Sequence, residues 1–272
     1  MTHIAHLADR GVIEVTGEDR VAFLQGLVSN DVALAVPGTA VWAALLTPQG
    51  KWLADFFILS DGNRLLLDVE RAQVALLVPR LTRFRLRAKV AIADVSDAWT
   101  VHVAWNGPAP AIPGLIAPDP RLPGAGWRIL SQATLPANAT PADWNAHRLS
   151  LGLPDGSADL EAEKSILLEA GFDELNGVSW SKGCYMGQEL TARTKYRGLV
   201  KRRLVPVITD GPLPSPGTPV LKAGLEVGTL RSAQGPRGLA SLRLDALAGP
   251  LTCDGMALSA EIPAWMRLPV TA

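Results

Sequence analysis

The chain has 272 residues, 48% hydrophobic and 19% charged, a composition typical of a folded globular protein of roughly two or three compact units. Its 26 basic and 26 acidic residues balance, which excludes an overall field that would attract nucleic acid or an anionic membrane, although local basic patches remain possible. Two cysteines are too few to hold an iron-sulfur cluster or a structural zinc within this chain alone, because such sites usually take about four ligands.

The first residues contain no positively charged segment followed by an apolar run, and no stretch is long and apolar enough to span a bilayer. The low cysteine content fits a reducing compartment. The sequence therefore predicts a cytoplasmic protein with no membrane partner and no direct nucleic-acid partner.

The first half of the chain alternates between strand and helix patterns. Strands are predicted at residues 11–15, 39–47, 51–59, 64–69, 86–93 and 127–130. Helices are predicted to begin near residues 19, 71 and 141, and Pro79 should kink or split the second. The turn at residues 48–50 predicts a hairpin, so the sheet is at least partly antiparallel. Residues 106–126 are rich in Pro, Ala and Gly and are predicted to be a loop or connector.

The last part of the chain consists of short apolar runs closely separated by Gly and Pro. The runs lie at residues 204–208, 219–221, 227–230, 239–244 and 256–262. This pattern favours a small antiparallel β-barrel. Cys253, beside Asp254 and Gly255, is predicted to lie in a turn and is assigned no chemistry. We therefore predict an α+β protein, with a mixed region at residues 1–200 and a barrel at residues 201–272.

One stretch, residues 181–193 with the sequence SKGCYMGQELTAR, gathers a cation, a thiol, an amide, a carboxylate and a guanidinium. Glycines on both sides of Cys184 predict a tight turn that runs into a helix, in which Glu189 and Arg193 are spaced as an i, i+4 pair. If Cys184 lies in the first turn of that helix, the free N–H groups and Lys182 favour its thiolate. A lone cysteine more often simply packs in a core, but the charged neighbours favour a functional site.

Lys182-Gly-Cys-Tyr-Met-Gly-Gln-Glu189 resembles the K-G-C-Y-x-G-Q-E signature of the YgfZ family, and the similarity extends over nearly the whole chain. That family is related to the T-protein, the aminomethyltransferase of the glycine cleavage system. Its members bind folate and are linked to iron-sulfur cluster assembly or repair, and its mitochondrial relatives serve late steps of assembly. The resemblance implies two ferredoxin-like or related subdomains around a central channel, followed by the barrel.

The resemblance also implies roles for individual residues. Cys184 would be the working thiol, assisted by Lys182, and a tetrahydrofolate or a derivative would bind in the channel. The implied folate contacts are Asp31, Arg148, Tyr185, Gln188, Glu189 and Arg193. Capping of a turn explains Asp31 equally well, and a surface salt bridge explains Arg148 equally well. The basic run at residues 195–203 could meet folate carboxylates, a protein partner or RNA, or could simply be an exposed strand or turn.

The chain departs from the transferases at one place. Their Asn-x-x-x-x-Asp turn after the strand at 64–69 is absent, and Asp68 falls on the strand itself. We therefore favour a folate-binding accessory protein that works with iron-sulfur assembly proteins or client enzymes, and leave open whether it catalyses a reaction. A folate-dependent one-carbon transferase is the alternative, and an indirect role in tRNA modification is a third. No metal is expected on this chain alone, but Cys184 could be a ligand shared with a partner.

Overall fold

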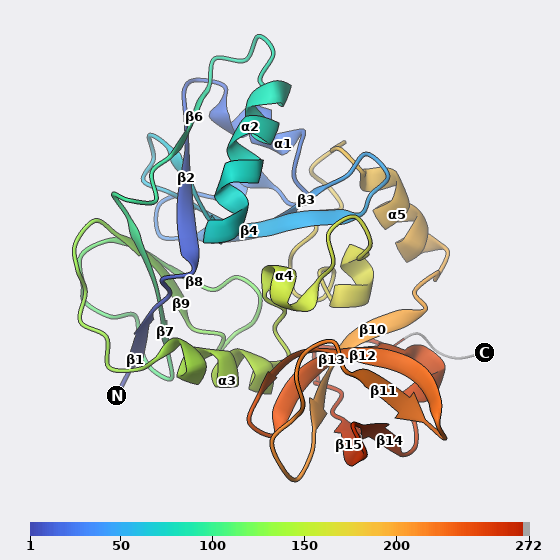
Figure 1. Cartoon of the computed structure of the whole chain (residues 1–272). Coiled ribbons are helices and arrows are strands. Elements are labelled where there is room, and N and C mark those ends of the chain that lie inside the picture. Colours follow the sequence, from blue (N-terminus) through green and yellow to red (C-terminus); the bar gives the residue numbers. More distant parts are fainter. Residues whose placement is uncertain (269–272) are drawn as a thin grey trace.

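Five strands form an antiparallel sheet in the order β3-β4-β5-β2-β6 in the computed structural model, which describes residues 1–268 (Figure 1). Their bounds are β2 Arg10–Thr16, β3 Ala40–Leu46, β4 Trp52–Ser60, β5 Leu65–Glu70 and β6 Ala91–Asp94. Every residue of β3 and β4 is buried. Strands that are buried along their whole length are typical of a sheet covered on both faces. The predicted hairpin joins β3 to β4.

Helices cover one face of this sheet. They are α1 Arg20–Gln25, α2 Val74–Phe84 and the short 3₁₀ helices η1 Val32–Leu34 and η2 Arg71–Gln73. Val74, Leu77 and Leu81 of α2 are buried against the sheet. We predicted that Pro79 would kink or split α2, and the helix is not split. Pro79 is exposed, so its missing hydrogen bond falls on the solvent side, while the leucines before and after it remain packed.

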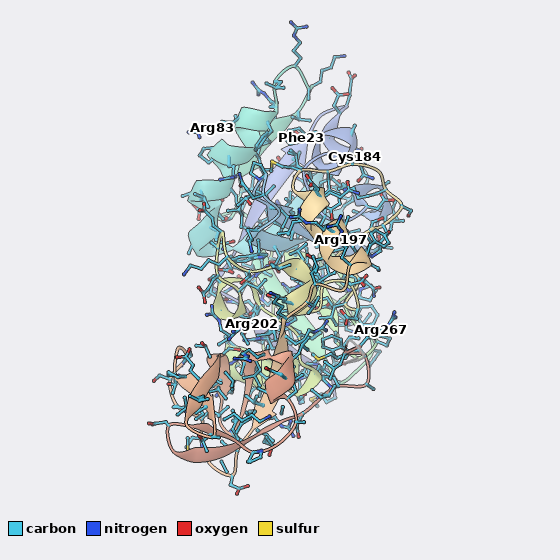
Figure 2. The ribbon with its side chains drawn as sticks, turned by 90° about the vertical axis from the view of Figure 1, so that its right-hand side faces the viewer. Phe23, Arg83, Cys184, Arg197, Arg202 and Arg267 are labelled. Atoms are coloured by element: carbon cyan, nitrogen blue, oxygen red, sulfur yellow. The ribbon has the colours of Figure 1, made fainter. Side chains whose placement is uncertain are left out.

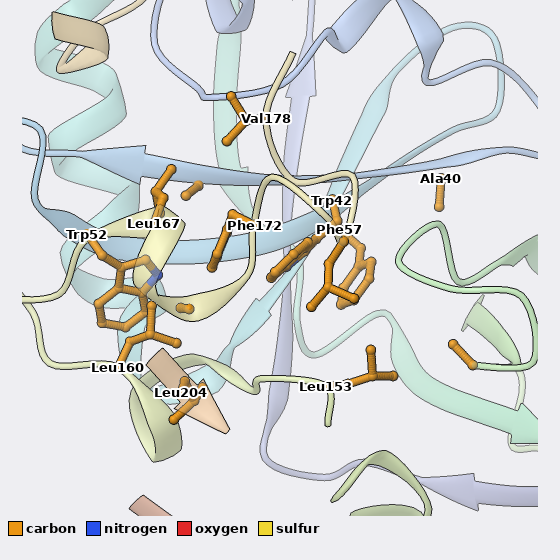
Figure 3. Close-up of a cluster of buried hydrophobic side chains, with 14 of the residues drawn as sticks. Ala40, Trp42, Trp52, Phe57, Leu153, Leu160, Leu167, Phe172, Val178 and Leu204 are labelled. Carbon is orange, nitrogen blue, oxygen red and sulfur yellow. The ribbon is translucent and has the colours of Figure 1, made fainter. Parts of the chain in front are cut away.

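The opposite face of the sheet borders the largest core. The ring of Trp42 stacks on that of Phe172 with centroids 3.9 Å apart, and Phe57 lies beside Trp42 (Figure 3). Leu160, which follows the short helix α4 Gly156–Asp159, and Leu167, Leu168 and Ala170 of η3 Leu167–Ala170 also belong to this core. Leu204 of the barrel also belongs to it. A single core therefore joins the first sheet, the central segments and the barrel.

A buried carboxylate lies in this core. Asp55 of β4 accepts hydrogen bonds from the indole N–H groups of Trp42, at 2.8 Å, and Trp52, at 2.9 Å. Burial raises the pKa of Asp55 to about 6, although the bond from Trp42 and the charge of Arg10 act in the opposite direction. Asp55 therefore changes charge close to neutral pH.

Four strands form a second antiparallel sheet in the order β1-β7-β9-β8. Their bounds are β1 His3–His6, β7 Thr100–Trp105, β8 Leu115–Pro118 and β9 Trp127–Ser131. Strand β8 lies in the region that we predicted to be a loop. A proline is tolerated there because β8 is an edge strand, and Pro118 needs no ladder hydrogen bond on the open side. The buried His102 faces His6, and burial together with His6 lowers the pKa of His102 to about 4.

Helix α3, Pro141–Leu151, packs beside β1 and follows the predicted bounds. Thr140 and Asp143 form a capping box at its start, and Pro141 occupies the first turn. Gly152 ends the helix in the left-handed conformation with φ of 74°.

The last six strands close into an antiparallel barrel in the order β10-β13-β12-β11-β14-β15. Their bounds are β10 Arg202–Ile208, β11 Pro219–Lys222, β12 Leu225–Gln234, β13 Arg237–Arg243, β14 Leu251–Cys253 and β15 Met256–Ala260, with η4 at Leu244–Ala246. The α+β fold with a C-terminal barrel is thus confirmed. Cys253 ends a strand and is buried, whereas Asp254 and Gly255 form the turn.

Candidate functional site

The signature forms an exposed loop that leads into α5, Gln188–Tyr196. Gly183 and Gly187 have φ of 98° and 80°, in the region that favours glycine, as the sequence predicted. A Cβ on Gly187 would lie 2.5 Å from the carbonyl oxygen of Thr47, and one on Gly50 would lie 2.5 Å from the Cβ of Leu190. The β3–β4 hairpin therefore packs directly against the start of α5.

Cys184 is exposed on this loop (Figure 2). The predicted turn does run into a helix, but α5 begins only at Gln188, so the condition under which the helix terminus would favour the Cys184 thiolate is not met. Gly187 has a left-handed backbone conformation and packs against the β3–β4 hairpin, so the helix cannot extend back through it to Cys184. Gln188 instead accepts a hydrogen bond from the Tyr185 N–H through its own side chain at 3.2 Å. The thiol is thus presented by a turn rather than by a helix terminus.

Lys182 anchors the loop. Its ammonium donates hydrogen bonds to the carbonyl oxygens of Val28, at 2.7 Å, and Asn30, at 2.6 Å. Burial lowers the pKa of Lys182 to about 8, while the nearby Asp31 acts in the opposite direction. Neither of these two hydrogen bonds goes to Cys184. They connect Lys182 to the backbone of residues 28 and 30, a contact that the sequence did not indicate.

Residues 26–31, which we call the support, are hydrogen-bonded to the signature and to the residues just before it. Further hydrogen bonds run from Met186 N to Gly26 O, from Ser179 N to Ser29 O, from Ser29 Oγ to Gly177 O and from Asn30 Nδ2 to Asn176 O, at 2.6–3.1 Å. The support and the signature, separated by some 150 positions, therefore form one unit. Capping of a turn was one of the two explanations of Asp31, and no local pattern indicated what Asn30 binds.

Asp31 is the last residue of the support and precedes η1. Its carboxylate accepts hydrogen bonds from the side chain of Gln25, at 2.7 Å, and from the N–H of Ala33, at 3.1 Å, at the start of η1. These are the contacts of a capping residue. A role for Asp31 in ligand binding stays a prediction.

Tyr185 turns inward from the loop. The ring is buried and lies 5.3 Å from the Lys182 ammonium. Burial raises the pKa of Tyr185 to about 12, with a smaller opposing effect from Thr191. Among residues 1–268, the Tyr185 hydroxyl and the Thr191 hydroxyl are both buried without a well-formed hydrogen bond. Buried polar groups normally have partners, and these two hydroxyls lie close to each other. A folate contact at Tyr185 stays a prediction.

The polar residues of α5 divide into two groups. Glu189 and Arg193 are exposed and remain available to a partner or ligand. Lys195 is used inside the protein, because its ammonium lies 2.9 Å from the Asp173 carboxylate and 4.1 Å from the centre of the Trp180 ring. The indole of Trp180 also donates to Asp173, at 2.7 Å, which fixes α5 against the body.

The remaining basic run is also mixed. Arg203 is buried and pairs with Glu174 at 2.9 Å. Arg197 and Lys201 are exposed. The run is therefore partly structural, and it does not form one continuous basic surface.

Arg148 lies apart from the loop, on α3. It is buried, and its guanidinium donates to Asn145, at 2.7 Å, to Asp159, at 2.7 Å, and to the carbonyl oxygen of Leu153, at 3.0 Å. The ion pair with Asp159 is a buried one rather than the surface salt bridge considered from the sequence.

Arg148 also lines an open cleft between α3, α4 and strand β12, with a volume of about 700 Å³. Arg10 lines the same cleft, and sequence reasoning missed it. Asp155 lies 3.7 Å from both guanidinium groups, a long distance for an ion pair. Ligand clefts commonly have volumes of roughly 300–1,000 Å³, so this one is large enough for a small molecule.

Asp68 is fully buried on β5, as its predicted place on the strand implied. Arg10 pairs with it at 2.6 Å, and Arg128 pairs with its other oxygen while covering the ring of Phe57 at 3.9 Å. Both carboxylate oxygens are thus bound by arginines. Asp68 is not available as a catalytic carboxylate.

Residues 1–268 contain neither a metal-binding cluster nor a membrane-spanning helix. No group of three or more His, Cys, Asp or Glu side chains there is placed to hold a metal ion. No helix in that range is long and apolar enough to cross a membrane.

Comparison with known proteins identifies the relatives of this chain. It is 33% identical to the human mitochondrial iron-sulfur cluster assembly factor IBA57 and 31% identical to that of the mouse, and each match covers 95% of this chain and 84% of the relative. The chain belongs to the IBA57 family. Residues 201–268 match the model of the CAF17 C-terminal β-barrel domain. The resemblance to YgfZ proteins is thereby confirmed.

A fungal IBA57 homologue, from Mycosarcoma maydis, is 37% identical over 75% of this chain, which spans 56% of that relative. These IBA57 relatives are all named as mitochondrial proteins, so our prediction of a cytoplasmic location is wrong. A low cysteine content fits any reducing compartment and cannot distinguish between them.

A solved structure shows the fold relationship. The aminomethyltransferase T of the glycine cleavage system from Bartonella henselae superposes with a TM-score of 0.75 over 97% of this chain and 86% of its own. Identity is 14%, so this match shows the fold alone.

Proposed function

We propose that this protein, like the IBA57 factors, serves iron-sulfur cluster assembly, and that Cys184 is the group through which it does so. The observation that carries the proposal is the exposed thiol on a loop that Lys182 and the support hold in place. A thiolate is a soft ligand suited to iron-sulfur clusters. Such a group is most useful on a rigid element, because a ligand that is already positioned loses less entropy on binding.

The cluster would be cargo shared between two proteins. Cys184 is the exposed cysteine of the chain, and the second cysteine, Cys253, is buried in the barrel. A cluster usually needs about four protein ligands, so a partner must supply the others. On binding, the Cys184 thiol loses its proton to solvent, and the sulfur donates an electron pair to one iron.

We also propose that a reduced folate binds in the cleft lined by Arg10 and Arg148. The cleft has a suitable volume, and a folate tail carries carboxylates that guanidinium groups recognise. The hydrogen bonds of Arg148 use Nε and Nη1. Nη1 of Arg10 has only the long contact with Asp155. When bound, a reduced folate supplies a one-carbon carrier, and the residues of this chain would hold and orient it.

Aminomethyl transfer is not supported. Asp68 is the nearest carboxylate in sequence to the missing transferase turn, and both of its oxygens are bound by Arg10 and Arg128. A carboxylate whose two oxygens are bound by buried arginines does not face a substrate in the cleft.

The test of the thiol compares two substitutions in a strain that lacks the native protein. Cys184→Ser should abolish the recovery of iron-sulfur enzyme activity and leave the melting temperature within a few degrees, because serine is nearly isosteric but is a poor iron ligand. Cys253→Ala is the matched control and should restore activity. Full recovery with Cys184→Ser would refute the role of the thiol.

Folate binding is tested separately by calorimetry with tetrahydrofolate. Ala158 is exposed at the cleft, so Ala158→Trp should block binding without touching the buried arginines. Ala257→Trp, on an exposed position of barrel strand β15, is the control. Equal affinity in both variants would place folate elsewhere, and no binding in the parent would remove folate from the proposal.

A further inference from the structure

The end of α2 and the loop that follows it form a basic tip, which we define as residues 80–89. It carries five basic residues, Arg80, Arg83, Arg85, Arg87 and Lys89. Figure 1 shows this loop at the top of the molecule, at the end opposite the barrel, and Figure 2 labels Arg83 there. The chain as a whole has no net charge, so this is a local concentration of positive charge.

Acidic residues neutralise only one end of the basic tip. Lys89 donates from its ammonium to Glu18 at 3.1 Å and from its backbone N–H to Asp19 at 2.8 Å. No ion pair within 4.0 Å joins any of the four arginines to a carboxylate of the described residues. Elsewhere, by contrast, arginines such as Arg203 are paired. Apart from a 3.5 Å hydrogen bond from Arg85 Nη1 to the carbonyl oxygen of Val90, the tip therefore keeps a positive charge that no carboxylate neutralises.

Apolar side chains occupy the same tip. Leu86 is 88% exposed and Phe84 is 38% exposed. Leu76, on the outer face of α2 two turns before Phe84, is 54% exposed. Exposed apolar residues are common singly, but here they lie among unpaired arginines.

The backbone at the apex is strained. Leu86 has φ of 46°, in the left-handed region that a leucine rarely adopts. Strained residues persist where the surrounding structure or a function requires them. The strained conformation keeps a large apolar side chain almost fully in solvent, which folding alone does not favour.

We propose that the basic tip docks onto an anionic lipid surface, with Leu86 and Phe84 entering the headgroup region. Arginines recognise lipid phosphates, and an apolar side chain flanked by such groups is the usual composition of an interfacial anchor. Single-stranded RNA would call for several stacking aromatics, and Phe84 is the one aromatic residue between residues 80 and 89. Figure 2 shows Cys184 on the other side of this end from Arg83, so docking leaves the thiol accessible.

The experiment is co-sedimentation of the full chain with vesicles. Vesicles of phosphatidylcholine with phosphatidylserine should bind the protein at low salt, and vesicles of phosphatidylcholine alone should not. Arg83→Glu/Arg85→Glu/Arg87→Glu should weaken binding about tenfold or more. The matched control is Arg197→Glu/Lys201→Glu/Arg267→Glu, which has the same charge change at exposed positions elsewhere and should bind as the parent does.

A second variant tests the apolar contribution. Leu86→Asn suits a positive φ, so it should leave the melting temperature unchanged or higher while reducing vesicle binding several-fold. The proposal fails if the parent ignores anionic vesicles at low salt, if the control triple variant loses as much binding as the tip variant, or if Leu86→Asn binds as the parent does. Tip-dependent binding to RNA without vesicle binding would equally overturn it.

Discussion

The ammonium of Lys182 donates a 2.6 Å hydrogen bond to the carbonyl oxygen of Asn30, across 152 positions of sequence. This bond and its neighbour to Val28 give the signature lysine a mechanical role. The two carbonyls belong to the turn after α1, where no backbone ladder satisfies them. The Lys182 ammonium thus supplies the hydrogen bonds that a strand or helix would otherwise give these two carbonyl groups.

Lys182→Ala should lower the free energy of unfolding by about 1–3 kcal/mol, because it leaves two half-buried carbonyl groups without a donor. Urea unfolding measures this loss. Lys164→Ala is a suitable control, since Lys164 is exposed and its pair with Glu161 is a surface one, worth at most about 1 kcal/mol. Equal midpoints for the two variants would contradict the anchoring role.

Gly183 and Gly187 offer a matched pair of substitutions. Both have positive φ, so alanine strains either position by about 1–2 kcal/mol. Only Gly187 also lacks space, with the Thr47 carbonyl oxygen 2.5 Å from a built Cβ, whereas nothing lies within 4 Å at Gly183. Gly187→Ala should therefore destabilise the protein clearly more than Gly183→Ala in thermal unfolding. The reverse order would mean that the hairpin does not rest on α5.

Asp55 should give the protein a stability that falls as pH rises. Its folded pKa of about 6 lies above its unfolded value near 3.8, so the folded state holds the proton longer, and its contribution is lost as pH rises through this window. The loss amounts to about 3 kcal/mol. Asp55→Asn removes the titration, so its stability relative to the parent should improve between pH 4 and pH 7. Parallel stability profiles for the parent and Asp55→Asn would show that Asp55 is not the responsible group.

Titration of His102 should make the free energy of unfolding fall as pH falls, the opposite of the effect of Asp55. Its folded pKa of about 4 lies below its unfolded value near 6.5, so its contribution is present above pH 6.5 and is lost as pH falls toward 4. The parent should lose about 3 kcal/mol from this group, and His102→Asn should lack that loss. His3→Gln, at an exposed histidine of the same sheet, serves as the control and should follow the parent. Acid unfolding at the same pH in the parent and His102→Asn would refute the assignment.

Much of the fold was predictable because it follows local patterns. The hairpin, the start and end of α3 and most barrel strands carry turn glycines, caps or apolar runs in the sequence. Strand β8 was missed because the proline-rich segment around it reads equally well as a loop, and only the edge of a sheet makes Pro118 acceptable. The course of α2 past Pro79 depends on which side of the helix faces the sheet, and that is a tertiary property.

The site was predictable in composition but not in geometry. The eight-residue signature marked Cys184 and Lys182, but the place of Cys184 relative to α5 depends on the packing of Gly187 against Gly50. Partners of Lys182, and the pairing of Arg10 with Asp68, lie 58 or more positions away in sequence. No local pattern encodes such distant contacts, which only the folded chain brings together.

The separation of the support from the signature has a consequence for biosynthesis. Residues 26–31 leave the ribosome long before Lys182, and 154 positions separate Val28 from its donor. Because both cysteines follow Lys182, a nascent or truncated chain that stops before it has no thiol at all. Even a chain that has just passed Cys184 must close this long-range contact before the thiol is held in place, and such closures are slow. A chain that stops before Lys182 therefore has no cysteine with which to bind iron or to occupy the assembly machinery.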